Sequence, residues 1–160
     1  GGTSYAVYGN VIWFSHFDDQ RLYRIIPGSD PQPITAESSV NSALRFAACT
    51  PDISRNRLIC VREDHRAEGE PRNELVAVSM DGSDQQGEIL FTQSDFVSAP
   101  QLSSDGLSIA FVSWSHPNMP WANTTLCPAN FPHDASLCNL TQHNVYTQES
   151  AIDPNCSDAG

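Results

Sequence analysis

The densest group of chemically capable side chains in this sequence is a short charged run. It consists of Arg62, Glu63, Asp64, His65 and Arg66, followed by Glu68 and Glu70. Carboxylates can accept charge-assisted hydrogen bonds from the ammonium group of a peptide's amino terminus. Surface charge runs are more often solvated connections with local arginine–carboxylate pairs. The run is therefore predicted either to contact a peptide or another domain, or to be a plain connection between strands.

A second candidate is the string His116-Pro-Asn-Met-Pro-Trp121. Its two prolines stiffen the backbone, and the tryptophan offers a broad apolar face. His116, Asn118 and Trp121 are therefore candidates for a loop that docks onto another domain or lines a substrate chamber. The alternative is that Trp121 only caps its own sheet. Neither interpretation makes the string catalytic.

Residues for nucleophilic or metal-assisted catalysis are not arranged in a usable pattern. Serine hydrolysis needs a nucleophile on a tight strand-to-helix turn, which Gly-x-Ser-x-Gly permits, and the sequence has no such string. We therefore predict no catalytic residue in this chain. Zinc-type ligands occur at Cys127, His133, Cys138 and His143, without the close pairing of zinc ribbons and fingers. No metal and no other cofactor is expected.

Length and charge restrict the class of protein. The 160 residues, of which 39% are hydrophobic, carry a net charge of −11, and a chain of this length suits one domain. All eight basic residues are arginine, and this acidic balance argues against a nucleic-acid partner. The longest apolar runs are far shorter than the roughly 20 residues of a membrane-spanning helix, so no membrane is expected as a partner. The start at Gly1-Gly2 suggests a processed chain, an excised piece or a gene fragment.

Cysteines and glycosylation triplets bear on the cellular compartment. The odd number of five cysteines prevents complete pairing within the chain, and Cys49 and Cys60 are expected to be free buried thiols. Asn123-Thr-Thr and Asn139-Leu-Thr fit the N-glycosylation pattern, although such triplets arise by chance in sequence rich in asparagine and threonine. A cytoplasmic location is expected, with a secreted or organellar one as the alternative.

Short apolar segments bounded by turn residues predict an all-β fold. Three strongly apolar strands, Val11–Ser15, Leu58–Arg62 and Ser108–Val112, recur about every 47–50 residues, close to the blade period of a β-propeller. We predict a partial propeller of about three blades with four strands each, spanning residues 1–36, 44–93 and 96–126. Residues 127–160 are predicted to be an irregular or disordered tail. Three blades leave raw faces and strand edges, so self-association is expected.

Several stretches resemble one known family. They are Val11–Ser15 with Asp19–Tyr23, Leu58–Arg66, Asn73–Val78, Asp95-Phe96 with Pro100–Ser103, and Trp114–Trp121. Together they resemble the early propeller of the prolyl oligopeptidase family of serine peptidases, in its acylaminoacyl-peptidase and dipeptidyl-aminopeptidase-like branch. The resemblance covers roughly residues 1–126, and fades where Ala122 replaces an acidic residue and Leu126-Cys127 replaces a Leu-Trp strand.

The resemblance implies a non-catalytic fragment. In such peptidases the propeller restricts access to an α/β-hydrolase domain, which is absent from these 160 residues. The expected partners are therefore a peptide substrate and that catalytic domain. Two alternatives remain open, a free-standing propeller-type interaction module and a truncated or frameshifted gene product with no function of its own.

Overall fold

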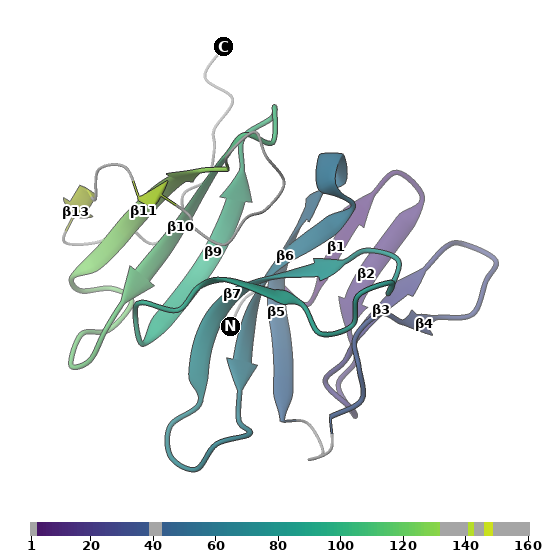
Figure 1. Ribbon diagram of the computed structural model, residues 1–160, viewed down its shortest axis with the longest axis horizontal. Coiled ribbons are helices and arrows are strands. Elements are labelled where there is room, and N and C mark those ends of the chain that lie inside the picture. Colours follow the sequence, from purple (N-terminus) through teal and green to yellow (C-terminus); the bar gives the residue numbers. More distant parts are fainter. Residues whose placement is uncertain (1–2, 39–42, 132–140, 143–145, 149–160) are drawn as a thin grey trace.

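The computed structural model describes residues 3–38, 43–131, 141–142 and 146–148. These residues form three antiparallel sheets that follow one another along the chain and lie side by side in a fan (Figure 1). Each sheet is built from strands that are consecutive in sequence, so each is one local unit. The predicted all-β, blade-like architecture is confirmed.

The first sheet has the strand order β1-β2-β3-β4. Its members are β1 (Tyr5–Tyr8), β2 (Val11–Ser15), β3 (Leu22–Ile25) and β4 (Gln32–Pro33). Strands β1 and β2 pair from Tyr8–Val11 outward, which leaves only Gly9 and Asn10 in the hairpin loop. Gly9 has a φ of 56°, a positive value that glycine adopts at little cost in such short loops.

The second sheet has the order β5-β6-β7-β8 and is the most regular. Its members are β5 (Leu44–Asp52), β6 (Arg57–Asp64), β7 (Arg72–Ser79) and β8 (Glu88–Phe91), with a short 3-10 helix, η1 (Ile53–Arg55), between β5 and β6. Asn56 ends η1 in the left-handed conformation, with a φ of 49°. Asparagine tolerates that region better than most residues, which allows the chain to turn directly into β6.

The third sheet corrects the expected boundary of the irregular tail. It contains β9 (Phe96–Leu102), β10 (Ser108–Trp114) and β11 (Thr124–Asn130), with β12 (Thr141–Gln142) and β13 (Tyr146–Gln148) paired to β11. Residues 127–130 are thus strand, although irregular chain was predicted from residue 127. Cys127, Ala129 and Phe131 alternate into the core, a pattern masked by the turn-forming residues Pro128 and Asn130. Residues 132–140, 143–145 and 149–160 of the predicted tail lie outside the described residues.

Two apolar cores fill the spaces between the sheets. The core between the first and second sheets includes Trp13, Leu22, Leu58 and Val76. Its Trp13 indole N–H donates to the carbonyl oxygen of Met80 at 3.1 Å, which satisfies the one polar atom of that ring. The core between the second and third sheets includes eleven buried residues, namely Ile59, Leu75, Ala77, Leu90, Phe91, Val97, Ile109, Phe111, Cys127, Ala129 and Phe131.

The innermost strands of the second and third sheets carry β-bulges at matching positions. Ala48 in β5 and Ala99 in β9 have φ values of 50° and 49°. The register of β5 against β6 shifts at Ala48, and that of β9 against β10 shifts at Ala99. From Ala48 to Ala99 is 51 positions, and the paired residues around both bulges keep this same offset. The two sheets therefore repeat one structural unit down to its irregularity.

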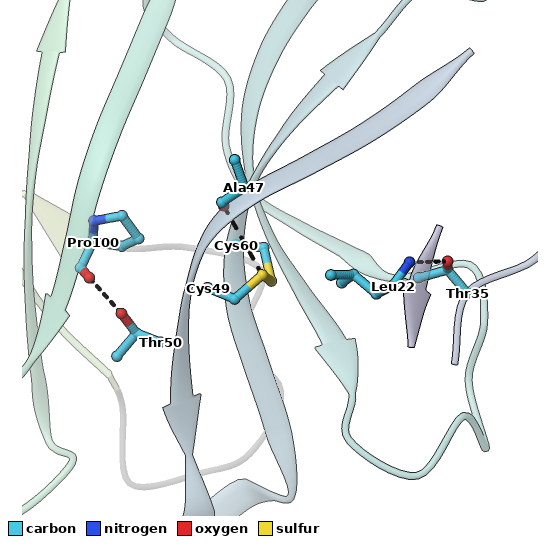
Figure 2. The surroundings of a disulfide bond; sticks show 7 residues. All are labelled: Leu22, Thr35, Ala47, Cys49, Thr50, Cys60 and Pro100. Carbon is cyan, nitrogen blue, oxygen red and sulfur yellow. Dashed lines mark hydrogen bonds between the residues drawn. A yellow bond between two sulfur atoms is a disulfide. The ribbon is translucent and has the colours of Figure 1, made fainter. Parts of the chain in front are cut away.

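Cys49 and Cys60 form a disulfide bond, so the expectation of two free thiols was wrong. The bulge explains the pairing, because it places Cys49 opposite Cys60 on the neighbouring strand, between the register pairs Ala47–Val61 and Thr50–Ile59. Figure 2 shows the bond between β5 and β6, with the Thr50 hydroxyl donating to the Pro100 carbonyl of β9 at 2.6 Å. Among the described residues, Cys127 is the free cysteine, and burial raises the pKa of its thiol.

Candidate functional site

A groove of about 730 Å³ runs along the inner strands β5 and β9. Its floor contains both bulge residues, Ala48 and Ala99, together with Cys49 and Pro100. Each of these strands lies at one edge of its sheet, because the sheet orders begin or end with them. The bulges bend the inner strands away from a flat ladder, and the groove lies where they do so.

Polar side chains line one part of this groove, namely Arg45, Glu63, Asn73 and Gln101. Glu63 and Asn73 are direct cross-strand partners on β6 and β7, and Arg45 lies opposite Glu63 from β5. The same face of β6 and β7 carries Ile59 and Leu75 deeper in the sheet, within the apolar core. The groove therefore begins where this face changes from apolar to polar.

An aromatic wall completes the groove on the side of the third sheet. Phe96 stacks on Trp114 with ring centroids 5.3 Å apart and planes at 17°. The imidazole of His116 meets Phe96 edge-on at 5.0 Å. Phe96 and Trp114 line the groove together with Pro120. The groove thus has a side with charged and amide groups and a side with aromatic rings, which suits a peptide better than a purely apolar or a purely charged ligand.

The charged run from Arg62 to Arg66 does not act as one surface. Arg62 is buried, at 4% exposure, because alternation along β6 turns it toward the inside of the sheet with Leu58 and Cys60. There it donates two hydrogen bonds to Glu74, at 2.6 and 2.9 Å. Glu74 is its cross-strand partner on β7 and is also buried. This buried ion pair was missed at the sequence level, although the alternation of β6 contains the signal.

The other members of the run form local pairs. Glu63 lies 3.0 Å from the His65 ring, and Asp64 receives a bidentate interaction from Arg66, with a shortest distance of 2.6 Å. The hydrogen bond from the Arg66 guanidinium lowers the pKa of the Asp64 carboxyl to about 2. Only Glu63 of these five residues reaches the groove. Of the two interpretations predicted for the run, the connection with local arginine–carboxylate pairs describes Asp64 and Arg66.

The charged run and the His116 loop meet at the rim of the groove. The His116 ring nitrogen Nε2 lies 3.0 Å from a carboxylate oxygen of Glu70, and the His116 backbone N–H donates to Asp95 at 2.9 Å. These contacts join the loop after β6 in the second sheet to the loop after β10 in the third. The two were separate candidates in the sequence, and the structure brings Glu70 of the one and His116 of the other together.

The other two candidates of that loop differ in their surroundings. The Asn118 backbone N–H donates to Ser115 at 3.0 Å, and its side-chain oxygen accepts from Asn123 at 3.4 Å. Trp121 is 61% exposed and does not cap its sheet. Arg45, Asn73, Phe96 and Trp114 complete the groove without having been predicted as site residues. Their common signal is position near one end of their strands, on the face that turns inward.

Two other classes of site are absent from the described part of the chain. No group of three or more histidine, cysteine, aspartate or glutamate side chains could hold a metal ion there. No helix among the same residues is long and apolar enough to cross a membrane. His133, Cys138 and His143, the other zinc-type ligands of the sequence, lie outside the described residues.

Comparisons with known proteins converge on one group of solved structures. A mutant of puromycin hydrolase complexed with PGG shares 30% sequence identity, with a TM-score of 0.76, and the match covers 93% of this chain and 25% of that chain. A second puromycin hydrolase structure shares 31% identity at a TM-score of 0.75, over 91% of this chain and 24% of that one.

A puromycin-hydrolyzing peptidase of Mycobacterium tuberculosis gives a similar result, with 30% identity, a TM-score of 0.76, and 92% and 24% coverage of the two chains. TolB from Acinetobacter baumannii shares the fold at 14% identity and a TM-score of 0.53. No protein-family model and no curated protein matches. The chain spans about a quarter of the length of the hydrolase structures that it matches.

Proposed function

This chain is an N-terminal propeller portion of the prolyl oligopeptidase family of serine peptidases, and from that premise we propose that its groove admits short peptides to a catalytic domain in a longer protein. The chain itself then binds and filters, and the peptide bond is cleaved elsewhere. The observation that carries the proposal is the groove along the inner strands, with its mixed polar and aromatic lining.

The size of the groove supports a filter for short or unfolded peptides. A cavity of about 730 Å³ takes an extended segment of a few residues and excludes a folded domain. Strands β5 and β9 lie at edges of their sheets, where backbone N–H and C=O groups can bind an extended peptide as an added strand. The bulges at Ala48 and Ala99 interrupt those edges, so they favour a passing peptide over a long permanent ladder.

The groove lining can contact both the polar groups and the apolar side chains of a peptide. The Glu63 carboxylate can accept hydrogen bonds from a peptide ammonium group, and the Asn73 amide can bond the peptide backbone. The stacked rings of Phe96 and Trp114 provide a flat apolar surface for a peptide side chain. Arg62 has no part in this, because Glu74 holds it inside the sheet.

The rim where His116 meets Glu70 is the proposed contact with the catalytic domain. Both side chains are exposed, yet they are held by each other, and His116 is also held by Asp95. A pre-ordered rim loses little conformational freedom on docking. We place the domain contact on the pair of His116 and Glu70.

A chimera tests the proposal. In the Mycobacterium tuberculosis puromycin-hydrolyzing peptidase, the matching portion is replaced by this chain, and kcat/KM is measured for peptides of increasing length. We expect Ser98→Trp, which fills the groove, to lower kcat/KM for long peptides much more than for a small chromogenic substrate. Ile53→Trp, at an exposed position outside the groove, is the matched control and should leave the ratio unchanged.

Equal losses for long and short substrates, or no loss at all, would refute the filter. Because a chimera can fail to assemble, a second measurement uses the isolated chain. Calorimetric titration with short peptides should give binding that Trp114→Ala and Glu63→Gln weaken and Ile53→Trp does not. Absence of binding to the correctly folded chain would count against the groove as a peptide site.

A further inference from the structure

We propose that Asn123 carries an N-linked glycan and that the Trp121 ring packs against the first sugar of that glycan. The acceptor pattern is Asn123-Thr124-Thr125, and an aromatic residue stands two positions before the asparagine. The proposal rests on two features, an exposed turn with an exposed tryptophan and the disulfide bond between Cys49 and Cys60.

The backbone presents Asn123 to solvent. Asn123 is exposed, has a φ of 57°, and is the residue directly before β11. The turn ahead of it is closed by a hydrogen bond from the Ala122 N–H to the Met119 carbonyl, at 2.8 Å. The Asn123 amide donates only a long 3.4 Å bond to Asn118. Glycan acceptors lie on surface loops, and this turn satisfies that requirement.

Trp121 supplies the second half of the argument. A tryptophan buries a large area when it packs, so leaving Trp121 61% exposed is unfavourable without a partner. Trp121 lies two residues from Asn123 in the same tight turn, within reach of anything attached to that amide. A sugar ring has one face of C–H groups, which packs on an aromatic ring while its hydroxyls stay in water. A glycan would therefore cover the indole without requiring another protein.

The disulfide bond gives independent evidence of the compartment. Cys49 and Cys60 are joined, and Cys60 is fully buried. Disulfides persist in the secretory pathway and outside cells, and they are rare in the cytosol. The same oxidising pathway is where N-linked glycans are added to Asn-x-Thr triplets. This proposal therefore favours the secreted alternative over the cytoplasmic location expected from sequence.

The covalent step balances with one co-reactant, an oligosaccharide linked to a lipid diphosphate. The Asn123 Nδ2 attacks the anomeric carbon of the first sugar and forms the N–C bond. The bond between that carbon and the phosphate oxygen breaks, the lipid diphosphate leaves, and one amide proton is lost to a base.

Peptide mapping tests the modification. The full chain is made in the secretory pathway of a eukaryotic cell, and in parallel the protein is recovered from its natural source. Both are treated with peptide N-glycosidase in heavy-oxygen water, which converts a glycosylated asparagine to labelled aspartate. We expect the label at Asn123, its loss in Thr125→Ala, and its retention in Thr125→Ser. An unlabelled Asn123 in either preparation overturns the proposal.

Thermal unfolding tests the packing of Trp121. Enzymatic removal of the glycan should lower the Tm of the wild-type chain by about 2–4 °C, the shift expected for a modest packing energy in a domain of this size. In Trp121→Ala the same treatment should leave Tm unchanged, while Met119→Ala, an exposed residue of the same loop, should keep the drop. An equal drop in Trp121→Ala would refute the contact and leave Trp121 as a docking residue.

Discussion

At the scale of single residues, this protein uses its few cations as partners for buried or half-buried carboxylates. Arg62 is bound to Glu74, and Arg55 and Arg57 both bind the buried Asp52, at 3.2 and 2.8 Å. The guanidinium groups of Arg55 and Arg57 also lie 4.9 Å from the Phe131 ring. These contacts link the second sheet to the third, so the arginines act chiefly as structural residues.

Removing Glu74 should be severely destabilising. Glu74→Leu leaves the buried Arg62 guanidinium without its carboxylate partner, and breaking a buried ion pair in this way costs about 3–5 kcal/mol of unfolding free energy. Arg66→Met, which breaks the exposed pair with Asp64, should cost about 1 kcal/mol or less. Urea unfolding of both variants measures the difference, and similar losses would contradict the assignment of Arg62 to the core.

Asp64 should contribute to acid unfolding. Its folded pKa of about 2, lowered chiefly by the Arg66 hydrogen bond, lies below the ordinary value, so the unfolded state binds more protons as the pH falls. This contribution is complete above about pH 4, is lost on acidification toward about pH 2, and amounts to about 1 kcal/mol after allowance for the exposed partner. Asp64→Asn should flatten the stability profile in that range. An unchanged slope between wild type and variant would refute it.

At the scale of the elements, the sequence was informative about strands and poor about their irregularities. The ends of β8 and β10 can be predicted from the sequence, because each strand is an apolar run bounded by turn residues. The disulfide could not be predicted, because it depends on a one-residue shift of register at Ala48, and no local pattern marks an alanine in the left-handed region. The bulges need tertiary contacts, such as the 2.6 Å hydrogen bond from Thr50 to Pro100, to hold them.

Only some of the groove residues were predicted, because strand alternation and the packing of the sheets decide which side chains face the groove. Composition identified the charged run, but alternation along β6 decides that Glu63 faces the groove and Arg62 faces the core. The pairing of Glu70 with His116 joins residues from different sheets, so it could not be inferred without the packing of those sheets. The predicted end of the third blade at residue 126 cuts β11 short, because the inward residues Cys127 and Ala129 are small and Pro128 interrupts the usual strand composition.

Because of the bulge, glycine substitutions at Ala99 and Ala110 should change the unfolding free energy in opposite directions. Ala99→Gly should stabilise the chain by about 1 kcal/mol, because glycine adopts the φ of 49° without the steric cost that alanine bears. Ala110→Gly, on the facing strand β10 beside the bulge, where the backbone is not left-handed, should destabilise by about 0.5–1 kcal/mol through added backbone freedom in the unfolded chain. Thermal and urea unfolding measure both. Destabilisation by Ala99→Gly would contradict the left-handed conformation.

At the scale of the whole molecule, the first sheet leaves an apolar face uncovered among the described residues. Tyr5 and Val7 are more than half exposed. Tyr5 and Val7 share their face with Phe14 and Ile12 across the β1–β2 register. Propeller blades normally bury both faces against neighbours, so this face is where an adjoining blade of a longer chain would pack. In isolation it is available to a second copy of the chain.

The isolated chain should therefore self-associate through that face. Tyr5→Ser with Val7→Ser should shift the weight-average mass toward the monomer in sedimentation equilibrium, because it removes two exposed apolar side chains of the face. Ile53→Ser, which removes an exposed apolar residue from the distant η1, should leave the association unchanged. A wild-type chain that stays monomeric at all concentrations, or an equal effect of the control, would contradict this expectation.

The matched bulges also bear on what the sulfur bridge is for. At the positions that correspond to Cys49 and Cys60, the third sheet has Pro100 and Phe111. The third sheet therefore forms the same kink without a disulfide bond. The bridge between Cys49 and Cys60 is then an addition to a backbone geometry that a sheet of this kind reaches without it.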